Sequence, residues 1–249
     1  MNVSLFNAAA ALNATSRWQE SIAENLAASA VPGFKKQEFS FESIRAGLMA
    51  VPGAGSRDHV LPRGVTATNF SQGALRPTGV KTDLAIEGGG FFAVQLPNGA
   101  TAYTRAGEFH ISSHGQLVTK EGYPVLGEAG PIQLDPNLLA ANPPAISPTG
   151  QISQGAAAIG KIRLVEFNDS QLLTPTGGGY FVANHPNLLP QNAVSSSLRQ
   201  GVLEAANTST PIEMVNLISA TRMFEANQRV IQMQDERMGR VITELGGLG

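Results

Sequence analysis

The spacing of apolar residues along the chain changes twice. The period is helical near the start, strand-like in the middle and helical again at the end. This order predicts an α+β fold in which a central antiparallel β domain lies between long N- and C-terminal α-helices. Because both helices carry an apolar stripe, we expect them to pair into a layer that resembles a coiled coil.

Four segments follow from this pattern. We expect an N-terminal helix over residues 1–34, an extended connector arm over 35–75, the β domain over 76–200 and a C-terminal helix over 201–249.

The first helix is expected over about residues 3–29. It must end before Val31-Pro32-Gly33, because proline disfavours a helical residue before it and glycine ends the turn at low cost. The apolar rows of this helix consist of Leu5, Leu12, Ile22 and Leu26.

The last helix has a clearer start signal and a longer seam. Thr210-Pro211-Ile212-Glu213 combines an N-cap hydroxyl, a proline at the first helical position and a capping-box glutamate. A heptad seam with polar residues beside it indicates a coiled coil, and two such helices at opposite ends favour an assembly of several helices. The alternative is a helix that packs only on this chain's own core. The seam residues are Leu217, Phe224, Ile231, Met238 and Leu245.

The middle of the chain contains two kinds of segment. Residues 35–75 have no sustained period, which indicates an extended arm with a short helix near residues 41–49. Beyond them, short apolar runs alternate with turn signals and predict an antiparallel β domain. The expected strands are 84–86, 91–96, 103–105, 108–111, 116–119, 162–167 and 180–183.

Composition and charge exclude several classes of function. With 42% hydrophobic and 14% charged residues, the chain can form a core, and a net charge of -2 predicts no nucleic-acid partner. The absence of cysteine excludes disulfides and thiol chemistry. No Lys or Arg precedes Arg17, so we expect no cleaved secretory signal.

A search for catalytic chemistry finds no candidate. Glu87-Gly88-Gly89-Gly90 precedes an apolar strand and lacks a following Lys-Ser/Thr, so it predicts a turn or bulge instead of a phosphate loop. We expect it to place Phe91 and Phe92 on opposite faces of a strand, and we expect Gly89→Val to destabilise the β domain. The four histidines lack metal-ligand spacing. The sequence therefore predicts no catalytic residue, no cofactor and no metal site.

Several ordered motifs resemble one known family. Near the start, the motif residues are Asn25, Leu26, Pro32, Gly33, Phe34 and Lys35. In the β domain they lie in 71–75, 82–94, 103–109 and 115–119, and this part includes Gly88, Gly90 and Phe91. At the end they lie in 200–207, 213–215 and 222–227. Together these segments resemble the axial proteins of the bacterial flagellum, which are rod, hook and related basal-body components.

The resemblance implies a structural function. It implies that the helices of residues 1–34 and 201–249 form an inner helical domain around an export channel and that the heptad residues of both helices contact other subunits. It also implies that the rod crosses the periplasm and transmits torque. It implies other rod subunits, copies of the same chain and the flagellar type III export apparatus as partners, with no small-molecule substrate. The short connector and residues 122–132 favour the proximal over the distal rod.

One rival class remains open at this point. An enzyme or a carbohydrate-binding β domain with helical dimerisation arms would have a concave pocket with convergent polar groups in residues 76–200. In an isolated axial subunit, by contrast, we expect the terminal helices to be largely unstructured, because a single amphipathic helix cannot bury its own stripe.

Overall fold

The structure is a computed structural model that describes residues 3–51, 55–139 and 141–246, and the chain divides into two compact units. The helical unit contains two helices and a long hairpin. The β unit contains Ala28–Lys36 and Asn69–Thr208. The structure thus has the two expected terminal helices and a mostly antiparallel β domain.

Both helices form close to the positions that their sequence signals predict. Helix α1 spans Val3–Ala27 and α2 spans Thr210–Gly246. The first intrahelical bond of α2 runs from the amide of Glu213 to the carbonyl of Ser209 at 3.0 Å, so the N-cap is Ser209, one residue before the predicted Thr210. Pro211 then lies in the first turn, where its missing N–H costs no hydrogen bond. In the described part of the chain, neither helix is apolar enough over a sufficient length to cross a membrane.

Most of the expected connector arm forms the two strands of a hairpin. Strand β1, Gln37–Val51, pairs antiparallel with β2, Gly55–Thr68, in a register that begins at Gln37 opposite Thr68. The predicted short helix near residues 41–49 is therefore wrong. The segment forms a strand because Phe39 and Phe41 alternate with polar residues, which is the period of a strand and not of a helix.

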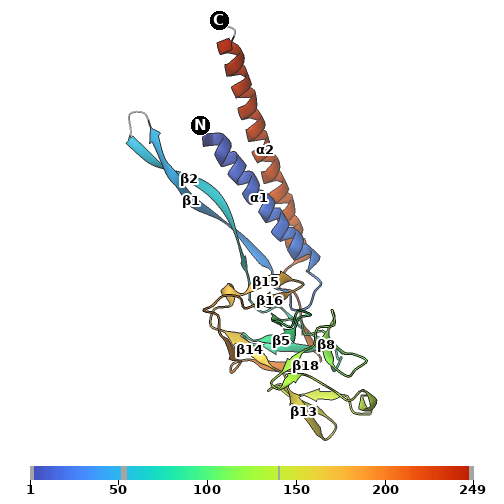
Figure 1. Ribbon diagram of the computed structural model, residues 1–249. Coiled ribbons are helices and arrows are strands. Elements are labelled where there is room, and N and C mark those ends of the chain that lie inside the picture. Colours follow the sequence, from blue (N-terminus) through green and yellow to red (C-terminus); the bar gives the residue numbers. More distant parts are fainter. Residues whose placement is uncertain (1–2, 52–54, 140, 247–249) are drawn as a thin grey trace. The chain divides into compact units, whose positions relative to one another are not determined.

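Helix α1 packs against α2 and against the hairpin (Figure 1). The ring of Trp18 lies 6.4 Å from the ring of Phe39 and 5.9 Å from the ring of Phe41, measured between centroids. Such contacts stabilise the hairpin, because a two-stranded ribbon alone is only marginally stable in water. The helical unit is therefore held together by α1, which contacts both of its other elements.

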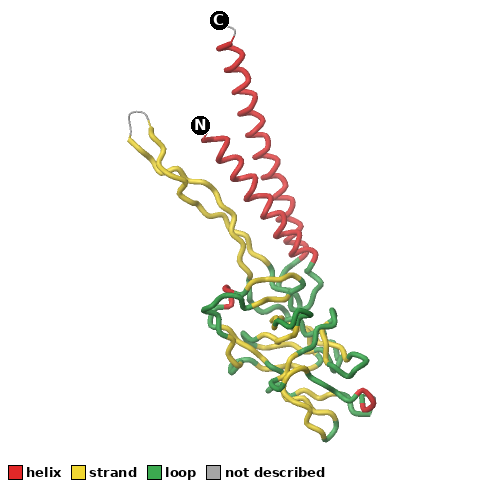
Figure 2. The backbone as a smooth tube through the Cα atoms, in the orientation of Figure 1, coloured by secondary structure: helices red, strands yellow, loops and turns green. Residues whose placement is uncertain are grey.

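The β unit consists of small antiparallel sheets (Figure 2). The largest sheet has the strand order β15 (Thr174–Gly177), β16 (Tyr180–Val182), β6 (Thr101–Thr104), β5 (Phe91–Gln95), β14 (Leu164–Phe167) and β17 (Pro190–Asn192). A three-stranded sheet contains β11 (Pro144–Ile146), β12 (Gln151–Gln154) and β13 (Ala157–Lys161).

The other strands of the β unit form pairs. These pairs are β3 (Leu75–Pro77) with β19 (Val202–Glu204), β4 (Leu84–Glu87) with β18 (Ser197–Gln200), β7 (Phe109–Ile111) with β8 (Leu117–Thr119), and β9 (Leu126–Gly127) with β10 (Gly130–Pro131). Two short 3₁₀ helices span Pro136–Leu138 and Ser170–Leu172. All seven strands expected from the sequence are confirmed in type, although their ends differ by one or two residues.

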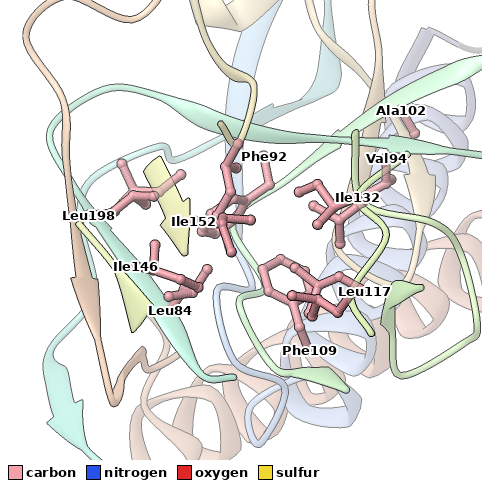
Figure 3. Close-up of a cluster of buried hydrophobic side chains, with 14 of the residues drawn as sticks. Leu84, Phe92, Val94, Ala102, Phe109, Leu117, Ile132, Ile146, Ile152 and Leu198 are labelled. Atoms are coloured by element: carbon pink, nitrogen blue, oxygen red, sulfur yellow. The ribbon is translucent and has the colours of Figure 1, made fainter. Parts of the chain in front are cut away.

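Strand β5 separates two hydrophobic clusters. Phe92 lies in the larger cluster, where its ring meets that of Phe109 at 5.0 Å in an edge-to-face contact (Figure 3). Phe91 lies in the other cluster, with Phe181 at 6.2 Å. Because the two rings lie in different clusters, the prediction that Phe91 and Phe92 point to opposite faces of the strand is confirmed. Both side chains are buried.

Candidate functional site

The predicted helix seams come together within the helical unit. On α2, Leu217, Phe224 and Ile231 are half-buried on one face, and Ala220 between them is fully buried. Because α1 packs along α2, the chain's own helix accounts for this coverage. The Nε2 atom of Gln19 lies 3.4 Å from Oγ1 of Thr221 and links the two helices.

On α1, three of the predicted packing residues are half-buried and one is buried. Ile22 is buried, while Leu5, Leu12 and Leu26 are half-buried. On α2, the seam continues to Met238, which is 51% exposed. The side chain of Leu245 lies outside the described residues. Contact of these residues with other subunits therefore stays a prediction.

The side chain of Asn25 holds the start of β1. Its Nδ2 donates to the carbonyl of Gln37 at 2.9 Å, and the amide of Gln37 donates back to Oδ1 of Asn25 at 2.8 Å. Asn25 is only 2% exposed, so its amide satisfies backbone groups that have little access to water. Asn25, one of the motif residues, thus fixes the first strand of the hairpin against the last turns of α1.

The turn at Pro32-Gly33-Phe34 has a backbone that requires glycine. Gly33 has a φ of +69°, and a Cβ atom there would lie 2.2 Å from the carbonyl carbon of Arg105. Its amide donates to the carbonyl of Glu204 at 2.7 Å, and the carbonyl of Phe34 accepts from the amide of Asn207 at 3.3 Å. The turn is thus bound directly to the last strand of the β unit.

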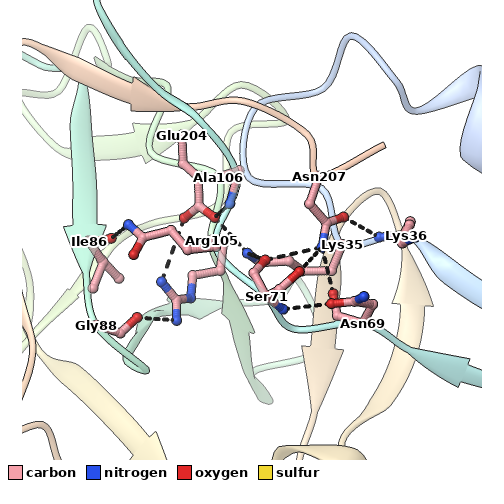
Figure 4. A network of polar contacts seen from close by, with 12 residues as sticks. Lys35, Lys36, Asn69, Ser71, Ile86, Gly88, Arg105, Ala106, Glu204 and Asn207 are labelled. Atoms are coloured by element: carbon pink, nitrogen blue, oxygen red, sulfur yellow. Dashed lines mark hydrogen bonds and ion pairs between the residues drawn. The ribbon is translucent and has the colours of Figure 1, made fainter. Parts of the chain in front are cut away.

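Next to this turn lies a buried ion pair. The Nζ atom of Lys35 lies 2.6 Å from Oε1 of Glu204, and both side chains have no exposed surface (Figure 4). Lys35 also donates to the carbonyl of Ser71 at 2.8 Å, and the amide of Gly73 donates to the same Glu204 oxygen at 2.8 Å. Burial lowers the pKa of Lys35, while the negative charge of Glu204 opposes that shift.

Arg105 extends this buried network to the glycine segment and the aromatic cluster. Its Nη1 lies 3.6 Å from Oε2 of Glu204, and its Nη2 donates to the carbonyl of Gly88 at 2.7 Å. The guanidinium carbon lies 5.0 Å from the centre of the Phe91 ring, which is a cation–π geometry. Burial lowers the pKa of Arg105, against the charges of Glu204 and Glu166.

The glycine segment has the predicted backbone role at two of its three positions. Gly88 has a φ of +118° and lies against Ser196, and the amide of Gly90 donates to Oγ of Ser196 at 2.8 Å. At Gly89 a Cβ atom would meet no atom within 4 Å, and φ lies outside the left-handed region. The prediction that Gly89→Val destabilises the β domain therefore has no support in the structure. The position that requires glycine is Gly88.

Asn207 closes the network at its other end. Its Oδ1 accepts from the amide of Lys36 at 2.7 Å, and its Nδ2 donates to the carbonyls of Asn69 and Ser71 at 2.8 and 3.1 Å. One side chain thereby joins three chain segments that are far apart in the sequence.

Sequence reasoning did not single out Lys35, Arg105, Glu204 and Asn207 as a group. All four lie inside the segments that carried the family resemblance, and this was the available signal. Their role in the structure is to tie the segments around residues 33–36, 69–73, 88, 105 and 204–207 to one another. Five of the motif segments that carried the resemblance thus meet at one buried polar network, through residues 35, 71–73, 88, 105 and 204–207.

A hollow of about 480 Å³ in the β unit lies next to the turn at Pro32-Gly33-Phe34. Pro32, Glu121 and Tyr180 are among its lining residues, and the Tyr180 hydroxyl donates to Oε2 of Glu121. Burial and this hydrogen bond raise the pKa of Tyr180, because both favour the protonated hydroxyl.

The four histidines lie in strands, turns and bends of the chain. His110, His114 and His185 are exposed, and the side chain of His59 lies outside the described residues. Among the described residues, no group of three or more His, Asp or Glu side chains is placed to hold a metal ion.

Comparison with known proteins identifies two matching family models. Residues 85–154 match the model of the flagellar hook protein FlgE/F/G D1 domain, and residues 199–244 match the model of the flagellar basal body rod FlgEFG protein C-terminal region. The first match covers much of the β unit, and the second contains Glu204, Asn207 and most of α2.

Similar proteins align with nearly the whole chain. The flagellar basal-body rod protein FlgF of Caulobacter vibrioides is 35% identical over 90% of this chain and 90% of its own length. The rod protein FlgG of Borreliella burgdorferi is 34% identical over 94% of this chain and 96% of its own length. FlgF of Mesorhizobium japonicum is 31% identical over 99% of both chains.

Proposed function

We propose, from the premise that this chain belongs to the flagellar basal-body rod protein family, that it is a subunit of the proximal part of the rod. Membership makes the chain a structural rod subunit located in the flagellar basal body, where it assembles with other rod components. The rival class, an enzyme or carbohydrate-binding domain with helical arms, is not favoured by these relatives.

The alignment with FlgF supports the proximal position. This chain and FlgF of Mesorhizobium japonicum are 31% identical over 99% of both lengths. The short segment before the β domain and residues 122–132 resemble the proximal component of the family, as the sequence indicated.

A second candidate position is the distal rod. It is supported by the 34% identity to FlgG of Borreliella burgdorferi, which is nearly the value for FlgF of Caulobacter vibrioides. The two positions differ in which neighbours the subunit meets along the rod, and the chemistry of the subunit is the same in both.

The helical unit is proposed to form the contacts that build the polymer. In this proposal α1 and α2 lie in an inner helical layer around the export channel and pair there as a coiled coil. This proposal is supported by the last part of α2, which α1 does not cover: all described positions from 235 to 244 are exposed. An amphipathic helix in water normally covers its apolar residues, so the exposed Met238 favours a neighbouring helix in the assembly.

The buried network is proposed to fix the β unit as a rigid body. Rigid subunits transmit torque along a rod without loss to internal motion, and the Lys35–Glu204 pair joins the two ends of the β unit. We further propose that the subunit passes through the flagellar type III export apparatus and that the finished rod crosses the periplasm.

Imaging of isolated basal bodies tests the proposed position. Density for α1, α2 and the hairpin is expected in the proximal part of the rod, next to the export apparatus. Density for this chain only in the distal part would contradict the proximal position, and its absence from the basal body would contradict the function as a whole.

A further inference from the structure

The turn that joins β5 to β6 consists of Pro97-Asn98-Gly99 and its flanking residues, and these three residues are exposed. The amide of Gly99 donates to the carbonyl of Leu96 at 2.9 Å, and the amide of Leu96 donates to the carbonyl of Ala100 at 2.9 Å. These bonds close a short hairpin loop in which Gly99 takes the left-handed position, with a φ of +81°. Asn98 therefore lies at the tip of a hairpin and is open to solvent.

Asn98 is the only asparagine of the chain that a glycine follows. An asparagine cyclises when the backbone nitrogen of the next residue attacks its side-chain carbonyl carbon, Cγ. A side chain on that next residue hinders the attack, and glycine has none. At Gly99 a Cβ atom would meet no atom within 4 Å, so the fold leaves space for a five-membered ring. Sequence and fold thus both favour cyclisation at this bond.

A hydrogen bond also makes the side chain of Asn98 a better electrophile. Its Oδ1 accepts from the amide of Ala100 at 3.0 Å. A donor at this oxygen draws electron density from Cγ and stabilises the negative charge that the oxygen acquires during the attack. The opposing factor is the bond from the Gly99 amide to the carbonyl of Leu96, which must open first. Because the loop is exposed, this bond opens at a small cost in free energy.

Asn25 shows the contrast within the same chain. Its Nδ2, which would be the leaving nitrogen, donates to the carbonyl of Gln37 at 2.9 Å, and its Oδ1 accepts from the amide of Gln37 at 2.8 Å. The side chain is 2% exposed, and the next residue, Leu26, carries a branched side chain. We therefore expect Asn25 to stay intact under conditions in which Asn98 reacts.

We propose that the Asn98–Gly99 bond is a site of spontaneous deamidation. The nitrogen of Gly99 forms a bond to Cγ of Asn98, the bond from Cγ to Nδ2 breaks, and ammonia leaves with the proton of the Gly99 amide. Water then opens the resulting succinimide at one of its two carbonyl carbons. Opening at Cγ gives aspartate with the normal backbone, and opening at the backbone carbonyl carbon gives isoaspartate. This modification is independent of the proposed function.

The modification changes the charge and the backbone of the turn. Each product adds a negative charge, and isoaspartate also adds a carbon atom to the backbone between β5 and β6. The turn borders a hollow of about 460 Å³, and Leu96, Pro97 and Tyr123 are among its lining residues. The added carbon is expected to disrupt the bonds that close the loop and to alter this hollow. Because the reaction is uncatalysed and slow, the modified fraction is expected to increase with the age of the subunit.

Incubation of the purified full chain at neutral pH tests the proposal. Trypsin releases residues 82–105 as one peptide, which contains Asn98 and no other asparagine. In mass spectrometry this peptide is expected to gain, over weeks, the mass difference between asparagine and aspartate, and chromatography is expected to separate an aspartate and an isoaspartate form. A synthetic peptide of residues 82–105 gives the rate without the fold. The folded chain is expected to react at no less than one tenth of that rate, and a slower reaction would overturn the proposal.

Two variants of the full chain identify the reacting atoms. Asn98→Gln lengthens the side chain, so that attack has to form a six-membered ring, and Gly99→Ala places a methyl group beside the attacking nitrogen. Each variant is expected to lower the rate at least tenfold. An unchanged rate in either variant, or a mass gain in other peptides with none in residues 82–105, would contradict the assignment.

Discussion

The ammonium group of Lys35 lies 2.6 Å from the carboxylate of Glu204, and neither side chain has exposed surface although 169 positions separate them in the sequence. The pair joins the segment that enters the β unit to the strand that leads out of it. Because a buried charge without its partner is costly, this contact makes folding of the β unit depend on both segments at once.

Glu204→Gln should therefore destabilise the β unit. It leaves the Lys35 ammonium and the Arg105 guanidinium buried without a carboxylate, at an expected cost of about 3–5 kcal/mol in the free energy of unfolding. Glu87→Gln is the control, because it removes an exposed ion pair with Arg199 and should cost about 1 kcal/mol or less. Denaturant unfolding measures both, and equal costs for the two variants would contradict the account of the network.

Gly33→Ala should be among the most harmful substitutions of a single glycine. The new Cβ would meet the backbone of Arg105 and Ala106, and φ is positive, so an expected cost of about 3 kcal/mol or more combines strain with overpacking. Gly99→Ala shares the positive φ but meets no atom within 4 Å, and it should cost only about 1–2 kcal/mol. A thermal melt that ranks Gly99→Ala as the worse variant would refute this reading.

Asn25→Ala should loosen the start of the hairpin. It removes both hydrogen bonds to the backbone of Gln37, with an expected loss of about 1–3 kcal/mol. Asn13→Ala, at an exposed position of the same helix, should change stability by less than about 0.5 kcal/mol. Amide hydrogen exchange at Gln37 offers a local measurement, and unchanged protection in Asn25→Ala would show that other contacts hold the strand.

Tyr180 should make stability fall at high pH. Its pKa is raised in the folded chain, so above pH 10 the native state binds more protons than the unfolded state, and the free energy of unfolding decreases as pH rises. Below pH 10 the Tyr180 hydroxyl is protonated in both states, so its full contribution to the free energy of unfolding is present there. Tyr180→Phe removes the ionisable group, so its stability should fall less between pH 9 and pH 11; parallel pH curves for the two proteins would contradict the assignment.

The end of α2 should be the first part of an isolated subunit to be cleaved. Residues 235–244 have no half-buried position, whereas the helix before them packs on α1. Trypsin is expected to cut after Arg237 and Arg240 before it cuts after Arg17. Earlier cleavage at Arg17 would support the broader expectation from the sequence that both terminal helices are largely unstructured in the monomer.

The sequence predicts those parts of the fold that depend on local periodicity. Phe91 and Phe92 alternate across β5 as expected, and the local signals place both ends of α1 and the start of α2 to within two residues. The sequence did not predict the hairpin, because Pro62 and Gly64 are residues that usually interrupt a strand. In a two-stranded ribbon a proline can take an open edge, and the ring of Phe39 fills the space beside Gly64.

The buried network could not be predicted in the same way. Lys35 and Glu204 are charged residues without a period, and nothing local indicates that the fold will bring them together. The heptad row of Leu217 and Phe224 correctly indicated a helical partner, but a single sequence does not say whether that helix belongs to the same chain. The structure supplies α1 as that partner.

Deletion of the gene, followed by electron microscopy of the basal bodies, tests the proximal rod position most directly. A linear assembly cannot add subunits beyond a missing one, so cells without this chain are predicted to have basal bodies whose rod stops within the proximal part, with no distal rod and no hook. Basal bodies that keep complete rods and hooks, or a short rod that ends where the distal part should begin, would contradict it.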